Sequence, residues 1–135
     1  MLERGCCPSQ HRIMDRSRPR RAARRAAILQ IIESRSADPG LSALSVAAEL
    51  GVSPRYVHAL LEETGRTFTH HVLECRLQKA ATLLVDPQWR ERKIAEVASE
   101  VGFSDLSYFS RAFRRRFGVT ASGFRDAARG AHKRA

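Results

Sequence analysis

The sequence predicts an all-α protein. Apolar residues recur at spacings of three and four in one segment after another along the 135 residues. Glycines and prolines separate those segments, and no stretch alternates apolar and polar residues for more than a few positions, as a half-buried strand would. Together these observations predict about seven helices joined by short turns.

The first predicted helix begins at Arg21. Residues 1–20 hold two prolines and a glycine among serines and arginines without periodicity, which predicts a disordered basic arm. Met14, within that arm, is a second candidate for the start of the protein. From Arg21 an apolar stripe that includes Ile28 and Ile32 predicts a helix, and the turn-forming residues 38–40 end it.

Each later helix is bounded by a cap or a breaker. The helix predicted over 42–50 ends at Gly51. Ser53 caps the next helix, because a serine oxygen accepts a hydrogen bond from a free N–H of the first turn, and Pro54 stands at the first helical position, where proline is tolerated. The remaining helices are predicted over the following ranges: 69–85, 93–101, 106–117 and 121–128, with a basic tail over 129–135.

Positive charge is concentrated at the two ends of the chain, whose net charge is +10. Residues 1–25 contain eight arginines and two acidic residues, and residues 106–135 contain eight basic residues and one acidic residue; the middle of the chain is slightly acidic. Such arginine-rich ends favour a polyanionic partner. No apolar run is long enough for a membrane span, no secretory signal is present, and three cysteines make no disulfide framework. We therefore expect a cytoplasmic protein, associated with the nucleoid.

One segment of the chain occurs twice. Residues 46–53 (VAAELGVS) recur as residues 97–104 (VASEVGFS), with five of eight positions identical. With one inserted residue the match continues to Tyr56 and Tyr108. A repeat of this kind predicts that one supersecondary unit is present in two copies.

The repeated unit has the features of a helix-turn-helix. A small residue in its first helix (Ala47, Ala98) allows the second helix to cross closely, and a glycine (Gly51, Gly102) supplies the left-handed backbone of a tight turn. The apolar residue after each glycine fills the angle between the helices. The two units are predicted over about 42–64 and 93–117, with a linker helix over about 69–85 between them.

These residues resemble the DNA-binding domain of the AraC/XylS family of transcriptional regulators. The second unit carries the resemblance in four segments: 94–98, 101–105, 107–114 and 117–120. The resemblance covers about residues 26–127, within a domain placed at 21–128, and departs from the family at Ala121, where proline is usual. Many relatives carry a sensor or dimerisation domain before this one, so the chain resembles either the stand-alone members or the detached end of a longer regulator.

The resemblance implies a sequence-specific regulator of transcription, more often an activator, that inserts two recognition helices into adjacent major-groove segments. Its expected partners are double-stranded DNA and RNA polymerase, and it is expected to bind as a monomer. In each recognition helix, the face opposite the apolar residues carries the candidate base-reading residues, which are also those that the resemblance places toward the groove: Arg55, His58, Ala59, Leu106, Ser107 and Arg111.

A second set of arginines is predicted to contact phosphates, which position a protein on DNA without specifying sequence. These residues are Arg114, Arg115 and Arg116, with Arg66 and Arg125 as weaker candidates. For each of them the alternative is a solvated surface charge.

Two other classes of function compete with DNA-binding regulation. Some DNA-repair methyltransferases carry the same helical module beside a zinc domain, but that domain needs several spaced cysteines, and only Cys6 and Cys7 precede the module here. The other alternative is a helix-turn-helix that binds protein. No metal-ligand spacing, phosphate-binding loop or activated nucleophile is present, so no enzymatic activity, cofactor or metal is expected.

Overall fold

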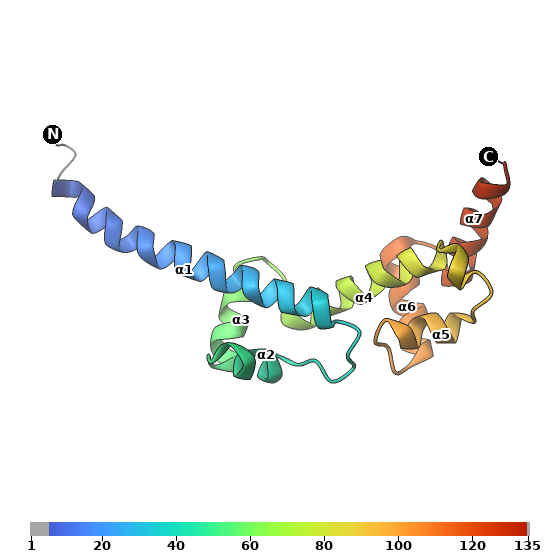
Figure 1. The fold of residues 1–135 in the computed structure, drawn as a ribbon, viewed down its shortest axis with the longest axis horizontal. Coiled ribbons are helices and arrows are strands. Elements are labelled where there is room, and N and C mark those ends of the chain that lie inside the picture. The colour runs from blue at the N-terminus through green and yellow to red at the C-terminus, as the bar shows by residue number, and fades with distance from the viewer. Residues whose placement is uncertain (1–5, 135) are drawn as a thin grey trace. The chain divides into compact units, whose positions relative to one another are not determined.

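The protein is all-helical in its computed structural model, which describes the backbone of residues 6–134 and the side chains of residues 18–130. Seven α-helices and one short 3-10 helix follow one another in this part of the chain (Figure 1). Their bounds are α1 (Cys6–Arg35), α2 (Ala43–Leu50), α3 (Pro54–Glu62), α4 (Phe68–Leu84), η1 (Pro87–Trp89), α5 (Ile94–Glu100), α6 (Leu106–Phe117) and α7 (Ala121–Arg134). None of the helices in the described ranges is both long and apolar enough to cross a membrane.

The helices form two compact units. The first contains α1 as far as Ile31 together with α2 and α3, and the second contains residues 32–41 together with α4 from Thr69 to the end of α7. The loop between α1 and α2 therefore belongs to the second unit, although α2 belongs to the first.

The first unit packs α2 and α3 against α1. Ile28, Val57, Leu60 and Leu61 are fully buried. Ser42 begins α2 with a reciprocal pair of hydrogen bonds to Ser45, which satisfies two groups that a helix start leaves free. This unit is the first of the two helix-turn-helices that the repeat predicts.

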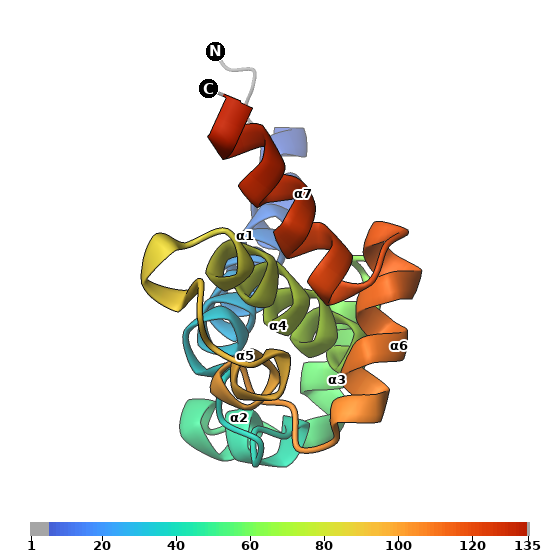
Figure 2. The same cartoon turned by 90° about the vertical axis from the view of Figure 1, so that its right-hand side faces the viewer.

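The second unit has a larger core, rich in aromatic side chains. Figure 2 shows the helices of this unit that contribute to it, α4, α5, α6 and α7. Phe109 and Phe113 of α6 are fully buried, and Phe113 meets Phe124 of α7 edge-on with ring centroids 5.5 Å apart. Val97 and Ala98 bring α5 against the same core. Because α6 is pinned on one side by these rings, its other side is left at the surface.

Most predicted helix limits agree with the structure. The helix predicted over 106–117 matches α6 at both ends, and Ser53 and Gly51 stand at the cap positions expected of them. The last helix is longer than predicted, since α7 continues from residue 128 to Arg134 and includes most of the expected basic tail. Alanine and arginine favour helix, and Gly130 alone does not stop it.

The N-terminal arm is the main difference. The sequence predicts disorder over residues 1–20, whereas α1 begins at Cys6 and continues through Pro19. Prolines interrupt this segment, but its arginines, Met14 and Gln10 are good helix formers, and the helix that begins at Arg21 offers a template to extend. Residues 1–5 lie outside the described residues, as do the side chains of 6–17.

Candidate nucleic-acid interface

Helix α3 is oriented by its cap and by its buried face. The Ser53 hydroxyl accepts a hydrogen bond from the Tyr56 N–H at 3.1 Å, and Pro54 occupies the first turn. The apolar face of α3 is buried in the core of the first unit. Arg55 and His58 are exposed, whereas Ala59 is half-buried. The base-reading set predicted for α3 thus has two polar side chains at the surface and one small side chain partly covered.

An ion-pair cluster holds the C-terminal end of α3 to α1. Nε of Arg21 donates to Glu63 Oε2 at 3.1 Å, Nη2 of Arg21 donates to the same oxygen, and Nη1 of Arg25 donates to Oε1 at 2.7 Å. Hydrogen bonding by Arg21, together with the charges of Arg21 and Arg25, lowers the pKa of Glu63 against a smaller opposing effect of burial. The guanidinium groups of Arg21 and Arg24 also lie 5.9 and 5.8 Å from the ring centre of Tyr56.

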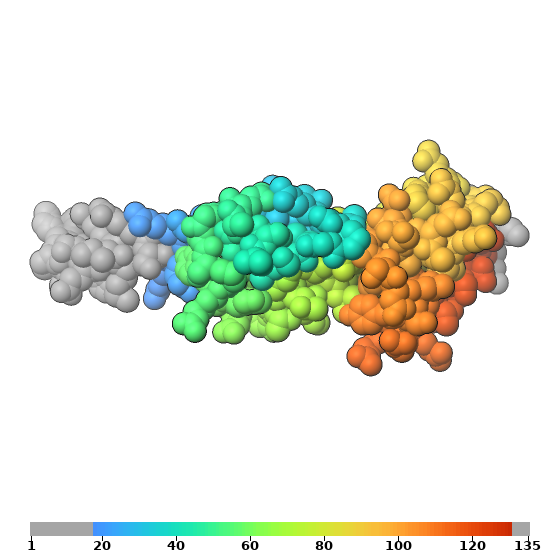
Figure 3. Space-filling view, turned by 90° about the horizontal axis from the view of Figure 1, so that it is seen from below, coloured from blue at the N-terminus to red at the C-terminus, as the bar shows by residue number. Residues whose placement is uncertain are grey.

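Helix α6 begins with a charged cap. The Asp105 carboxylate accepts hydrogen bonds from the N–H groups of Ser107 at 2.8 Å and Tyr108 at 3.3 Å, where the helix dipole also favours negative charge. This cap fixes the first turn, in which Leu106 and Ser107 are exposed; Leu106 keeps 46% of its surface accessible. Side chains of the α6 segment, in orange, stand out from the surface of their unit in Figure 3.

The exposed face of α6 carries a row of arginines. Arg114 and Arg115 come three and four residues after Arg111, so each of them is a neighbour of Arg111 on the helix surface. Within the described part of the chain, none of the three side chains makes an ion pair or a side-chain hydrogen bond. Like charges at these spacings destabilise a helix by about 0.2–0.5 kcal/mol per pair, so the stability of the fold does not explain why the three arginines stand together. Binding to a polyanion would explain it.

Arg116 differs from its neighbours. Its guanidinium binds the Glu74 carboxylate of α4 in a fork, with Nε to Oε1 at 2.9 Å and Nη2 to Oε2 at 2.9 Å, and it lies 4.9 Å from the ring centre of Phe117. Hydrogen bonding to Glu74 raises the pKa of Arg116. This arginine ties α6 to α4, a role that the sequence does not predict for it.

The remaining two arginines of the predicted phosphate set also separate. Arg66 is exposed in the turn after α3. Arg125 of α7 instead donates to the backbone oxygen of Arg92 at 2.7 Å and lies 3.4 Å from that of Trp89. Arg125 thus holds the segment between η1 and α5 against α7.

Sequence reasoning missed the group that anchors the turn of the second helix-turn-helix. Gly102 has a φ of +111°, and a Cβ there would lie 2.6 Å from the backbone oxygen of Ser36 and 2.8 Å from Nε of Arg76. Arg76 Nε donates to that Ser36 oxygen at 2.6 Å, and Lys79 Nζ donates to the buried Ser36 hydroxyl at 2.8 Å. The loop after α1, the linker helix α4 and the turn before α6 therefore meet at one point.

One signal in the sequence could have pointed to this anchor. Arg76 stands between Val72 and Ala80 at spacings of four, so a cation interrupts the buried stripe of the predicted linker helix. Burial lowers the pKa of Arg76, as expected for a cation withdrawn from water. A cation in such a stripe needs acceptors, and here they are backbone oxygens.

Comparison with known proteins gives consistent matches. Residues 46–127 match the family described as a helix-turn-helix domain. The transcriptional activator RhrA of Rhizobium meliloti is 36% identical over 102 residues, which cover 76% of this chain and 32% of RhrA. The chain spans about a third of the length of the curated relatives it matches.

Solved structures share the fold. The C-terminal domain of AraT, a response regulator from Geobacillus stearothermophilus, aligns with a TM-score of 0.69 and 34% identity, covering 76% of this chain and 84% of that domain. A transcriptional regulator from Chromobacterium violaceum, described among AraC-type DNA-binding domain-containing proteins, aligns with a TM-score of 0.66 and 26% identity, covering 75% and 88% of the two chains.

Proposed function

Because the chain belongs to the AraC-type helix-turn-helix family of DNA-binding transcriptional regulators, we propose that it binds double-stranded DNA at specific sequences and thereby regulates transcription. The observation that carries this proposal is the row of Arg111, Arg114 and Arg115 on the exposed face of a helix whose opposite face is buried. The function is one of binding, without catalysis.

In this proposal α3 and α6 are the recognition helices. Arg55 and Arg111 each offer a planar fork that matches the two acceptors of guanine, and His58 and Ser107 offer single hydrogen bonds. Leu106 offers apolar surface suited to a thymine methyl group, and half-buried Ala59 adds a little more. Arg114, Arg115 and Arg66 are assigned to phosphates.

Each recognition helix is proposed to read a different half-site. The residues at matching places differ, because α3 presents Arg55 and Ala59 where α6 presents Ser107 and Arg111. One chain would then occupy an asymmetric site of about two helical turns, since successive major-groove segments lie about 34 Å apart. Bending of the DNA would help both helices enter, at an elastic cost of a few kcal/mol.

Selection of bound sequences from random duplexes tests the proposal. We expect one asymmetric motif with two separated blocks, retained by one chain per duplex in a stoichiometry measurement. The Arg111→Ala variant should lose about 1–3 kcal/mol of binding to that motif and relax the preference at one base position. Arg115→Ala, the matched control, should weaken binding to all sequences equally and reduce the salt slope by about 0.9.

Two results would contradict this assignment. Selection of a palindrome protected by two chains would overturn the monomer arrangement. Retention of no sequence above background, with no dependence of retention on salt, would favour a protein-binding helix-turn-helix instead.

Activation is the finer part of the proposal. RhrA, which matches most of this chain, is described as a transcriptional activator. We propose that this chain likewise raises transcription, through contact with RNA polymerase. A transcription assay with purified polymerase and the selected motif placed upstream of a weak promoter should give more transcript with the protein than without it. Less transcript would assign repression.

A further inference from the structure

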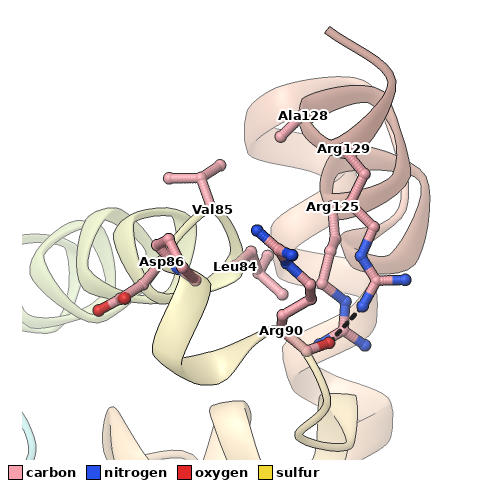
Figure 4. Close-up of a pocket in the computed structure, with 8 residues that line it drawn as sticks. Leu84, Val85, Asp86, Arg90, Arg125, Ala128 and Arg129 are labelled. Carbon is pink, nitrogen blue, oxygen red and sulfur yellow. Dashed lines mark hydrogen bonds between the residues drawn. The ribbon is translucent and has the colours of Figure 1, made fainter. Parts of the chain in front are cut away.

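A pocket of about 440 Å³ lies in the second unit, away from the exposed face of α6. The end of α4, the turn that contains η1 and one side of α7 form its walls (Figure 4). The residues that matter for its chemistry are Leu84, Val85, Arg90, Arg125, Ala128 and Arg129. Its size is within the range of pockets that hold small molecules.

The pocket is cationic. Three arginines line it, and Asp86 is its single acidic lining residue. The Asp86 carboxylate is engaged elsewhere, because it accepts a hydrogen bond from the Gln88 N–H at 2.9 Å, and Figure 4 shows it pointing away from α7. The lining of the pocket therefore carries more positive than negative charge, with three arginines and one carboxylate.

The three arginines are not equally available. Arg125 donates to the backbone oxygen of Arg92, which accounts for one end of its guanidinium. Arg129 donates through Nη2 to the backbone oxygen of Arg90, and the Glu91 carboxylate, 4.0 Å from that nitrogen, is 91% exposed. Nε of Arg129 is buried and has no hydrogen-bond partner among the described residues. Figure 4 shows the Arg90 guanidinium extending toward Val85 and α7.

An unsatisfied, buried N–H on a cation is unfavourable, and an acceptor placed beside it removes that penalty. A carboxylate suits the position, since it accepts charge-assisted hydrogen bonds from guanidinium groups. The opposite wall is apolar: Leu84 is buried, Ala128 is half-buried, and Val85 leaves 49% of its surface exposed at the pocket mouth. A bare inorganic anion would leave this apolar wall in contact with water.

We propose that this pocket binds a small carboxylic acid with an apolar body. The carboxylate would lie between Arg129 and Arg90, and the apolar body would cover Leu84, Val85 and Ala128. The proposal concerns a site separate from the recognition helices and does not depend on DNA binding.

Titration of the full chain with hexanoate, followed by the backbone amide spectrum, tests the proposal. We expect saturable shifts at Val85, Arg90 and Arg129, with a dissociation constant in the millimolar range or tighter for a ligand of this size. Acetate carries the charge without the apolar body, and 1-hexanol carries the body without the charge. Both should bind at least about tenfold more weakly.

Two variants locate the binding, and a third serves as a control. Arg129→Gln removes the charge and should weaken hexanoate about tenfold or more, whereas Arg20→Gln, an exposed arginine of the other unit, should not change it. Val85→Asp places a negative charge at an exposed position of the mouth and should abolish binding while the rest of the spectrum stays folded. This second variant keeps the test valid if Arg129→Gln does not fold.

Three outcomes would overturn the proposal. The first is the absence of saturable shifts at about 20 mM hexanoate, well above the expected range. The second is equal binding of acetate and hexanoate, which would indicate a simple anion site. The third is unchanged hexanoate affinity in folded Val85→Asp.

Discussion

Substitution of Gly102 by alanine should destabilise the second unit far more than the same substitution at Gly118. Both glycines have positive φ, +111° and +84°, so an alanine is strained at either position. A left-handed backbone at a residue with a Cβ costs about 1–2 kcal/mol. At Gly118 nothing lies within 4 Å of the new Cβ, so this strain is the whole expected effect.

At Gly102 the new Cβ meets a second obstacle. The backbone oxygen of Ser36 would lie 2.6 Å away, and the Arg76 nitrogen that binds this oxygen would lie 2.8 Å away. Relief of the clash requires the loop after α1 to move and the Arg76 hydrogen bond to lengthen or break. Loss of a hydrogen bond from a charged group costs about 1.5–3 kcal/mol, so we expect a total of about 3–5 kcal/mol for Gly102→Ala when backbone strain is included.

Chemical denaturation followed by helical circular dichroism measures both variants. Because Gly118 belongs to the same unit as Gly102, the comparison removes the strain that the two share. In thermal unfolding the difference should be visible directly, at about 4 °C in Tm for each kcal/mol in a domain of this size. Equal destabilisation by the two substitutions would refute the close approach of the turn to Ser36.

Three further predictions concern the ion pairs and the N-terminal segment. First, Glu74→Gln and Arg116→Gln should weaken DNA binding by the same small factor and leave the salt slope unchanged, because the ion pair positions α6 against α4. A lower salt slope in Arg116→Gln alone would mean that Arg116 contacts a phosphate. Second, the pKa of Glu63 is lowered in the folded protein, so the ionised carboxylate adds to the free energy of unfolding. This stabilisation is present above the ordinary pKa of 4.5 and is lost as the pH falls through the lower folded pKa. The free energy of unfolding, measured from pH 6 into the acid range, should therefore depend less on pH in Glu63→Gln than in the unchanged protein. Third, deletion of residues 1–20, which keeps Arg21 and its partners, should lower affinity for all sequences without changing preference, and the salt slope should fall by about 0.9 for each phosphate that the shortened chain no longer neutralises; an unchanged slope would mean that these residues do not contact DNA.

The fold could be predicted in large part because its signals are local. The caps at Ser53 and Asp105, the glycine after each first helix and the apolar spacing in α6 each act within a few residues of the chain. The repeat also predicts how the helices are grouped, since two copies of one sequence pattern imply two copies of one helix-turn-helix. The structure extends α1 back to Cys6 through the segment for which the sequence predicts disorder. That prediction considered the prolines and arginines of the segment by themselves and left out the helix that follows them.

The partners of individual arginines could not be predicted, because they lie far away in the sequence. Arg116 and Arg115 are adjacent and chemically identical, yet only Arg116 faces Glu74. Likewise, Gly51 and Gly102 occupy matching places in the repeat, but nothing lies near a Cβ at Gly51, whereas Ser36 and Arg76 lie against one at Gly102. Such differences arise from packing between distant segments, which a pattern within one segment does not contain.

The placement of residues 32–41 has a consequence for how the protein is made. The chain enters the second unit at residue 32, returns to the first at residue 42 and leaves it again after residue 68. Each unit is therefore built from two separate segments of the chain, and a segment of the other unit lies between them in the sequence. During synthesis the first unit can complete itself once Phe68 has emerged. Residues 32–41, which include the Ser36 that lies against Gly102, can take their final place only after the helices from α4 onward have also been translated. No single cut yields two whole halves: a break after Phe68 leaves the later fragment without Ser36, and with no acceptor for Arg76.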